Sequence, residues 1–224
     1  MKKETPFGKA VKDTYRLLAE SMTKKLEARG HTAFYAETAE DALKKVLELI
    51  PVGASVGVPG SVTIREIGAI DALAARGNKV IHHWIPGASP DERDEARFEE
   101  FNCDALLVSS NAITKEGVLV NIDGSGNRVA AMCWSRGDRI FVIRMNKVCP
   151  DVESAVKRVQ ECATPPNAVR LNMQSPCAAC GCHAPKGCIG PGSLCRTVLI
   201  TEQAPFMPFG KKSYVILVGE TLGY

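Results

Sequence analysis

The chain has 224 residues, of which 45% are hydrophobic and 24% charged, with a formal net charge of +3. This composition is typical of a soluble globular protein with one large α/β domain or two small ones. The small charge and the lack of basic runs interleaved with aromatic residues argue against nucleic-acid binding. No apolar stretch reaches membrane-spanning length, and no apolar signal segment follows Met1–Pro6, so we expect a cytoplasmic protein.

Hydrophobic periodicity divides the chain into alternating helices and strands. A helix is predicted over Phe7–Ala28, and Thr38 begins a second helix, which ends before Pro51 and has Asp41 placed to reach back to the cap. The strands expected along the chain are His31–Tyr35, Ala54–Val58, Lys79–Trp84, Asp104–Ser109, Gly117–Val120 and Arg139–Ile143. The further helices expected are Thr63–Ala75, Asp91–Phe101, Val129–Met132 and Asp151–Ala163.

Strands that alternate with helices predict an α/β fold with an open, mostly parallel sheet and helices on both faces. The apolar run Asp104–Val108 indicates a central parallel strand, with Asn111 at its carboxyl end. The pattern breaks near Thr164–Pro166, and two strand-like runs follow, Arg196–Thr201 and Tyr214–Val218. Because two strands alone make a poor core, we expect them to extend the edge of the sheet.

The polar run Asn121–Arg128 lies between a predicted strand and a predicted helix. Its glycines, Gly124 and Gly126, allow tight turns and close approach of a ligand to the backbone, and amides at the start of a helix favour an anion. Asn121, Asp123, Asn127 and Arg128 add polar or charged groups beyond what a simple turn needs. The alternative is an ordinary connection tightened by Asn and Asp side chains.

Two further loops follow predicted strands. Pro59–Glu66 is a strand–Gly–helix junction, with Ser61 or Thr63 as the helix cap, and Ser109–Thr114 follows the central strand. Ligands in open α/β sheets bind beyond the carboxyl ends of the strands, so these loops are expected to converge on a small anionic ligand. Glu66 and Asp123 are candidate proton-transfer groups. The candidate ligand-binding residues are Gly60, Ser61, Thr63, Asn111, Asn121, Asp123, Gly124, Gly126, Asn127 and Arg128.

Five of the nine cysteines fall within the Cys-rich loop, residues 173–195. Thiolates at this density can ligate a [4Fe–4S] cluster or zinc, although the spacing matches neither common ferredoxin runs nor a paired zinc ribbon. Free thiols or a disulfide are the alternative. The candidate metal ligands are Cys177, Cys180, Cys188 and Cys195, with Cys182 as a competing ligand.

Several other polar or sulfur-containing residues receive structural interpretations. His82 and His83 end a predicted strand and are expected to make surface hydrogen bonds rather than bind metal. The charged run Asp91–Glu100 is interpreted as a solvated helix face. Cys103 and Cys133 lie in apolar stretches and are expected to be small core residues.

The runs Gly60–Gly68, Ser110–Gly117 and Val120–Ala130 resemble the LUD-domain family, the family of lactate-utilisation protein C. The resemblance covers most of the chain and implies a single domain over residues 1–224 with the NagB/RpiA/CoA-transferase-like fold. Relatives on that fold bind sugar phosphates, CoA esters or folates at these loops. The Cys-rich loop resembles a tail found in some LUD-domain proteins, particularly at Cys188 and Cys195, although lactate-utilisation protein C is not expected to depend on one.

The resemblance implies a soluble component of organic-acid oxidation of the lactate type, which binds a small anionic ligand and has iron–sulfur proteins as partners. The glycine-rich loops also fit a group-transfer or isomerising enzyme acting on a sugar phosphate or CoA ester. A non-catalytic ligand-binding protein with a structural metal is a third hypothesis. Fold analogy does not transfer an activity, so the sequence leaves open whether the chain is an enzyme and whether it forms a homo-oligomer.

Overall fold

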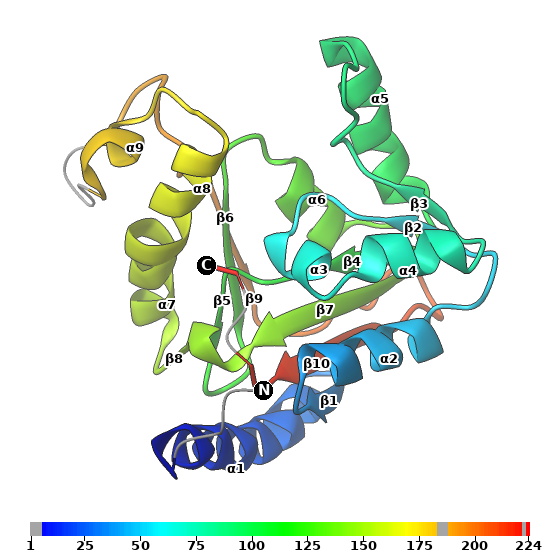
Figure 1. The fold of residues 1–224 in the computed structure, drawn as a ribbon, viewed down its shortest axis with the longest axis vertical. Coiled ribbons are helices and arrows are strands. Elements are labelled where there is room, and N and C mark those ends of the chain that lie inside the picture. Colours follow the sequence, from blue (N-terminus) through cyan, green and yellow to red (C-terminus); the bar gives the residue numbers. More distant parts are fainter. Residues whose placement is uncertain (1–5, 183–187, 221–222) are drawn as a thin grey trace.

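Two sheets organise the chain in the computed structural model, which describes residues 6–182, 188–220 and 223–224 (Figure 1). Within these residues, the larger sheet has six strands, all parallel to their neighbours. Their order across the sheet is β1 (Thr32–Ala36), β10 (Ser213–Val218), β7 (Asp138–Arg144), β4 (Ala105–Val108), β2 (Ser55–Gly57) and β3 (Lys79–Ile81). The α/β fold with a parallel sheet is therefore confirmed.

A smaller sheet of four described strands adjoins the larger one. Its order is β8 (Val148–Cys149), β5 (Ala112–Thr114), β6 (Leu119–Asp123) and β9 (Thr197–Thr201). The β5/β6 and β6/β9 pairs are antiparallel, whereas β5/β8 is parallel. The sequence predicted the strand at Gly117–Val120 but not this second sheet, because β5 is only three residues long and carries no alternating pattern.

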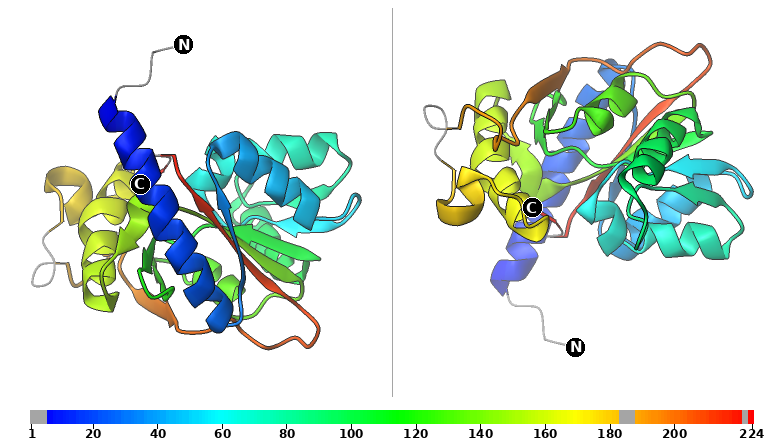
Figure 2. Two further views of the ribbon diagram at one scale, coloured as in Figure 1. Left: turned by 90° about the horizontal axis from the view of Figure 1, so that it is seen from below. Right: turned by 90° about the horizontal axis from the view of Figure 1, so that it is seen from above.

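Helices cover both faces of the larger sheet. On one face lie α2 (Ala39–Leu49), α3 (Val62–Glu66) and α4 (Ala69–Ala75), whose apolar side chains pack against alternate residues of the strands. On the other face lie α1 (Pro6–Ala28) and α6 (Asn127–Cys133). The core beneath α1 also includes Ile113 and Leu119 of the smaller sheet, so this helix spans the junction between the sheets (Figure 2, left).

The remaining helices lie on two sides of the molecule. They are α5 (Pro90–Glu99), the 3-10 turns η1 (Glu100–Asn102) and η2 (Met145–Lys147), α7 (Val152–Arg158), the π-helical turn η3 (Val159–Ala163), α8 (Thr164–Arg170) and α9 (Pro176–Cys180). The helices α7 to α9 lie beside the smaller sheet and α5 lies on the opposite side (Figure 1). The apolar face of α7 and η3 packs against the outer face of the smaller sheet. No described helix combines the length and the apolar character that crossing a membrane requires.

The central strand lies where its apolar run predicts. All four residues of β4 are buried, and the strand is parallel to β7 on one side and to β2 on the other. Leu107 lies opposite Ile140 of β7, and both side chains are fully buried. Two-sided burial explains why β4 is continuously hydrophobic rather than alternating.

The placement of the chain's last strand corrects a prediction. β10 lies between β1 and β7, inside the larger sheet, and not at its edge. Its consecutive buried residues Val215–Val218 are the signature of a strand covered on both faces. The other strand of the tail, β9, does lie at an edge, that of the smaller sheet.

Two predicted helix boundaries are also wrong. The helix expected over Thr63–Ala75 is divided into α3 and α4 by Gly68, whose φ of +71° ends one helix before the next begins. The break expected near Thr164–Pro166 is instead the start of α8, because prolines in a first helical turn sacrifice no intrahelical hydrogen bond. The cap predicted at Thr38 is confirmed, since its side chain accepts from the Asp41 amide.

Candidate functional site

Polar side chains gather where four neighbouring strands of the larger sheet end. Because β7, β4, β2 and β3 are parallel and adjacent, their carboxyl ends lie along one edge. Lys147 follows β7, Ser109 follows β4, Ser61 follows β2 and His83 follows β3. This edge is where an open α/β sheet binds its ligands.

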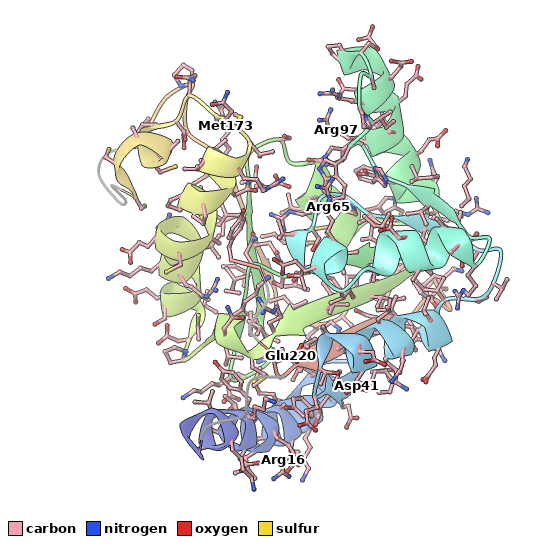
Figure 3. All side chains as sticks on the ribbon, in the orientation of Figure 1. Arg16, Asp41, Arg65, Arg97, Met173 and Glu220 are labelled. Carbon is pink, nitrogen blue, oxygen red and sulfur yellow. The ribbon has the colours of Figure 1, made fainter. Side chains whose placement is uncertain are left out.

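These residues line a cleft with a volume of about 940 Å³. One wall comes from the β2–α3 loop, the residues after β3, and α5. The opposite wall comes from α8 and the segment Pro191–Arg196. Figure 3 shows Arg65 and Arg97 on one side and Met173 on the other, and all three line the cleft. The floor is formed by the strand ends and by the loop that leads from β6 into α6.

The cleft is strongly cationic. Of the described residues that line it, seven are basic and Asp123 is the single acid. The basic residues are Arg65, Arg93, Arg97, Arg128, Lys147, Arg170 and Arg196. Low-dielectric walls lined by one sign of charge concentrate the field, so this cleft attracts anions.

Arg65 and Arg170 carry like charges on the two walls. Partial burial lowers the pKa of Arg65, and repulsion by Arg170 lowers it further. Arg65 also lies over the Trp84 ring, with its guanidinium carbon 3.6 Å from the ring centre, which holds the charge against one wall. An anion bound between the two guanidinium groups would relieve their repulsion.

A buried polar network supports the floor. The Asn121 side chain is fully buried, its Oδ1 accepts from the Asn111 amide at 3.0 Å, and its Nδ2 donates to Ser110 Oγ at 3.0 Å. The Arg128 guanidinium donates to Asn121 Oδ1 and Asn111 Oδ1, each at 3.0 Å, and to the Ile122 carbonyl at 2.7 Å. These bonds hold the loop after β4 against β6, and they engage most of the Arg128 guanidinium inside the protein.

The helix amides expected to bind an anion are already occupied. Asp123 Oδ2 accepts from the amides of Arg128 and Val129, at 3.1 and 3.2 Å, in the first turn of α6. At the start of α3, Ser61 Oγ accepts from the Ile64 amide. The protein's own side chains therefore cap both short helices, and the positive character of the cleft comes from its Arg and Lys side chains.

Lys147 was not identified from the sequence. Its side chain is buried on the cleft floor, with Nζ 3.2 Å from Thr63 Oγ1, 3.1 Å from Ser109 Oγ and 3.2 Å from the Ser110 carbonyl. Burial lowers the pKa of Lys147 to about 7, with smaller contributions from nearby guanidinium groups. Lys147 could have been selected because it lies just beyond the predicted strand Arg139–Ile143. The loops after other predicted strands were selected as candidate sites for this reason.

The structure also corrects two interpretations at the cleft rim. His83 lines the cleft, and its Nδ1 lies 2.9 Å from Glu100 Oε1, so it is not simply a surface residue. The Glu100 side chain is fully buried and not solvated as the charged run suggested. This pairing fixes the orientation of the imidazole ring, and it depends on a contact across seventeen positions of the chain.

Most of the predicted ligand-binding residues lie together at the cleft. Those lining it are Gly60, Ser61, Thr63, Asn111, Asp123, Gly124, Asn127 and Arg128. Asn121 and Gly126 do not line it: Asn121 lies beneath the floor, and Gly126, with a φ of +88°, precedes α6. Glu66, a proposed proton-transfer group, is likewise outside the described lining.

None of the nine cysteines, all of which lie within the described residues, forms a disulfide bond. In the Cys-rich loop, Cys177 is buried in α9, so part of this segment is helical rather than an irregular loop. Burial raises the pKa of the Cys195 thiol, and the nearby thiols of Cys188, Cys182 and Cys177 raise it further. Elsewhere, Cys103 is buried as expected, whereas Cys133 at the end of α6 is exposed, which contradicts its predicted core position.

The described residues contain no group of three or more His, Cys, Asp or Glu side chains arranged to hold a metal ion. His183, next to Cys182 in the sequence, lies outside the described residues. The effect of three other thiols on the Cys195 pKa does not amount to a coordination site among the described residues. The predicted cluster or zinc site stays a prediction.

Comparison with known families places the chain. The LUD domain model matches residues 19–218, which is most of the sequence. The chain belongs to the LUD-domain family. This family is associated with lactate utilisation. No match was found among curated proteins.

The chain is also similar to a solved structure, a DUF162 family protein from Deinococcus radiodurans determined at 1.70 Å resolution. The similarity covers 92% of this chain and 98% of that one, with 14% sequence identity and a TM-score of 0.49.

Proposed function

We propose that the protein binds a small organic-acid anion, or a derivative that carries one, in the cationic cleft as a component of organic-acid oxidation of the lactate type. The observation that carries this proposal is the charge of the cleft, with seven basic residues and one acid among its described lining. The acid, Asp123, is engaged by helix amides and does not neutralise the arginines on the walls.

The size and construction of the cleft support a small-molecule ligand. Its volume of about 940 Å³ falls within the range of roughly 300–1,000 Å³ that is usual for ligand sites. Trp84, Ile85 and Leu171 add apolar surface between the charged groups. Fixed polar groups beside apolar surface orient a ligand and distinguish it from bulk anions.

The family's association with lactate utilisation supports the metabolic assignment. The same charges would also suit a sugar phosphate or the phosphates of a CoA ester, which is the alternative function in group transfer or isomerisation. Calorimetric titration with lactate, pyruvate, a sugar phosphate, CoA and inorganic phosphate separates these classes. We expect an organic acid to bind more tightly than inorganic phosphate, because it also uses the apolar surface.

Arg170→Gln is the variant that tests the role of the walls. Arg170 is exposed on α8, and its one described hydrogen bond joins it to Asn167 within the same helix, so its removal leaves the core intact. We expect roughly ten- to hundredfold weaker binding of the organic acid, as for loss of one charge-assisted hydrogen bond. Arg128 is a poor probe, because its substitution would also break the network beneath the floor.

Arg16→Gln is the matched control. It removes the same charge from α1, where Arg16 pairs with Glu20 on an exposed surface, and Figure 3 places it far from Arg65 and Arg97. Binding should change less than twofold, since screened charges beyond about 10 Å contribute little. Equal losses in the two variants would mean that only net charge matters and would refute a specific site between the walls.

The Cys-rich loop enters this proposal only as a further prediction. Anaerobic reconstitution with iron and sulfide, followed by metal analysis, tests whether Cys177, Cys180, Cys182, Cys188 and Cys195 hold a cluster. Zinc content of the purified protein tests the alternative metal. If the protein takes up neither iron nor zinc, and if replacing these residues by Ser leaves its stability unchanged, the Cys-rich loop carries only thiols.

A further inference from the structure

Lys147 occupies an unusual position for a lysine. Lysines are almost never fully buried unless they are paired, yet Lys147 is only 5% exposed, at the bottom of a cleft lined by arginines. In the described chain its three hydrogen-bond partners are two hydroxyl groups and one carbonyl, all uncharged. A lysine that served only to balance charge would be expected to contact a carboxylate.

The charged groups around Lys147 are mainly cationic. Arg158 of α7, Arg144 of β7 and Arg128 of α6 face it from three elements, and Glu66 of α3 opposes them more weakly. Arg144 is itself fully buried, and among the described residues its three guanidinium nitrogens have no hydrogen-bond partner. This environment disfavours another positive charge, and with burial it lowers the pKa of Lys147 to about 7.

A neutral amine has a lone pair that an ammonium group lacks. Enzymes that use a lysine as a nucleophile lower its pKa in this way, by desolvation and by neighbouring cations. The cleft around Lys147 collects anions, so an electrophile arriving there would carry a negatively charged group. A small carbonyl compound with an adjacent carboxylate has both the electrophilic carbon and the charge.

We propose that Lys147 is the nucleophilic amine of the cleft and condenses with the carbonyl carbon of a small 2-oxo acid. This inference rests on the proposed anion-binding function, because the carboxylate is held by the basic residues of the cleft. Nζ attacks the carbonyl carbon, a C–N bond forms, and the carbonyl oxygen leaves as water. The product is an imine. The water contains the carbonyl oxygen and the two protons that the amine loses.

The hydroxyl groups of Thr63 and Ser109 both contact the reacting nitrogen. Their hydroxyl groups are 3.2 and 3.1 Å from Nζ, close enough to exchange hydrogen bonds with the amine and with the carbonyl oxygen. Each hydroxyl can donate and accept, which suits a reaction that moves protons from nitrogen to oxygen. The Ser110 carbonyl accepts a hydrogen bond from Nζ at 3.2 Å.

Reductive trapping tests the covalent step. Pyruvate and sodium cyanoborohydride are added to the full-length protein at pH 7, and peptide mass mapping locates the secondary amine. We expect Lys147 to be labelled at least about tenfold faster than Lys44, an exposed lysine of α2 that forms a salt bridge with Glu40. Acetone, which has the carbonyl but no carboxylate, should label Lys147 much more slowly than pyruvate. Labelling of Lys147 no faster than Lys44 would overturn the proposal.

Variants localise the reaction. Lys147→Arg should abolish the trapped adduct in the cleft, whereas Lys44→Arg should leave it unchanged. Because Lys147→Arg could disturb folding, a second measurement uses the unaltered chain. Competitive acetylation by acetic anhydride from pH 5 to 11 should give Lys147 a midpoint near 7, far below that of Lys44, whose pKa is raised by Glu40. A midpoint near that of an ordinary lysine, or no acetylation of Lys147, would contradict a reactive amine.

Calorimetry on the same preparations separates the two proposals. If inorganic phosphate and pyruvate bind but no adduct is trapped, the nucleophilic role fails and the anion site stands. If neither anion binds while acetone and acetic anhydride still select Lys147, the reactive amine is supported and the anion-binding function fails.

Discussion

The two sheets are stabilised by different chemistry. The larger sheet is buried between two apolar layers, and residues such as Leu107, Ile140 and Ile216 are fully buried in its hydrophobic core. The smaller sheet has apolar cores too, but its edge toward the cleft is tied by Asn121, Asn111 and Arg128 through directional hydrogen bonds. Hydrophobic packing tolerates small changes of shape, whereas hydrogen bonds fix positions and leave costly unpaired groups when one partner is lost.

The polar, hydrogen-bonded part of the structure lies next to the candidate site, and the apolar part lies away from it. The cleft lies at the carboxyl edge of the larger sheet, where β7 is followed by Lys147 and where buried polar residues become frequent. Even within the larger sheet, the buried arginines lie at the two ends of β7, Arg139 near its start and Arg144 at its end. The apolar interior supplies stability, and the polar end supplies the fixed geometry that a ligand site requires.

The largest expected effect is at Asn121. Asn121→Leu keeps a similar side-chain volume but leaves the Asn111 amide and an Arg128 nitrogen without their partner and removes one hydrogen bond from Ser110 Oγ. We expect a loss of roughly 3–5 kcal/mol in the free energy of unfolding, measured by urea denaturation. A loss below about 1 kcal/mol would show that packing, and not the network, holds the smaller sheet in place.

The next largest effect is a loss of stability at low pH. His31 is buried beside Phe141 with Nδ1 2.8 Å from Ser213 Oγ, and burial, followed by repulsion from Arg29, lowers its pKa from 6.5 to about 4. Because the folded chain binds this proton less readily than the unfolded chain, the His31 contribution is present above pH 6.5 and is lost as pH falls toward 4. Relative to His31→Gln, the native chain should lose about 3 kcal/mol between pH 7 and pH 4.

Urea denaturation of both chains at several pH values measures this loss. Ser213 contacts the ring but does not titrate, so Ser213→Ala should keep the same slope against pH as the native chain. Parallel profiles for the native chain and His31→Gln would contradict a buried neutral imidazole.

A smaller loss of stability is expected from a change in the apolar core of the larger sheet. Leu107→Met changes the shape of a fully buried side chain in β4 without adding a polar atom. The expected loss is about 1 kcal/mol, because hydrocarbon neighbours rearrange around a flexible side chain of similar volume. If this variant cost as much as Asn121→Leu in the same denaturation experiment, the two sheets would not differ in the proposed way.

The smallest effect on stability is expected at Arg170. Arg170→Gln should change the free energy of unfolding by less than about 0.5 kcal/mol, since the side chain is exposed on α8 and outside both cores. Weaker ligand binding with unchanged stability would show that Arg170 serves the binding site and does not contribute to the stability of the fold. Destabilisation by more than 2 kcal/mol would instead assign Arg170 a structural role.

The sequence predicted the alternation of elements because hydrophobic periodicity is local. The helix Phe7–Ala28 and the central strand Asp104–Val108 were found from apolar spacing alone, and α1 and β4 match them. The placement of Tyr214–Val218 was wrong, because nothing within those residues specifies that β10 inserts between β1 and β7. These two pairing partners lie far from β10 along the chain, β1 much farther than β7, and they are selected by the whole core.

The candidate site was found in part for the same reason. Gly60, Ser61 and Asp123 were selected as polar loop residues after predicted strands, and all three line the cleft. Lys147 and the His83–Glu100 pair were missed, because their importance lies in burial and in neighbours that the sequence does not place together. Local polarity identifies loops, but it does not identify which side chains lose contact with water.

The sequence by itself therefore determined the family, the parallel α/β architecture and the loops at the strand ends, since these depend on residue spacing and turn chemistry. Only the tertiary structure decided that β10 is internal, that Asp123 caps α6 in place of an external anion, and that Lys147 is desolvated among three guanidinium groups. Each of those outcomes depends on distances between distant segments. Burial and charge act through space, and they are fixed only when the whole chain has folded.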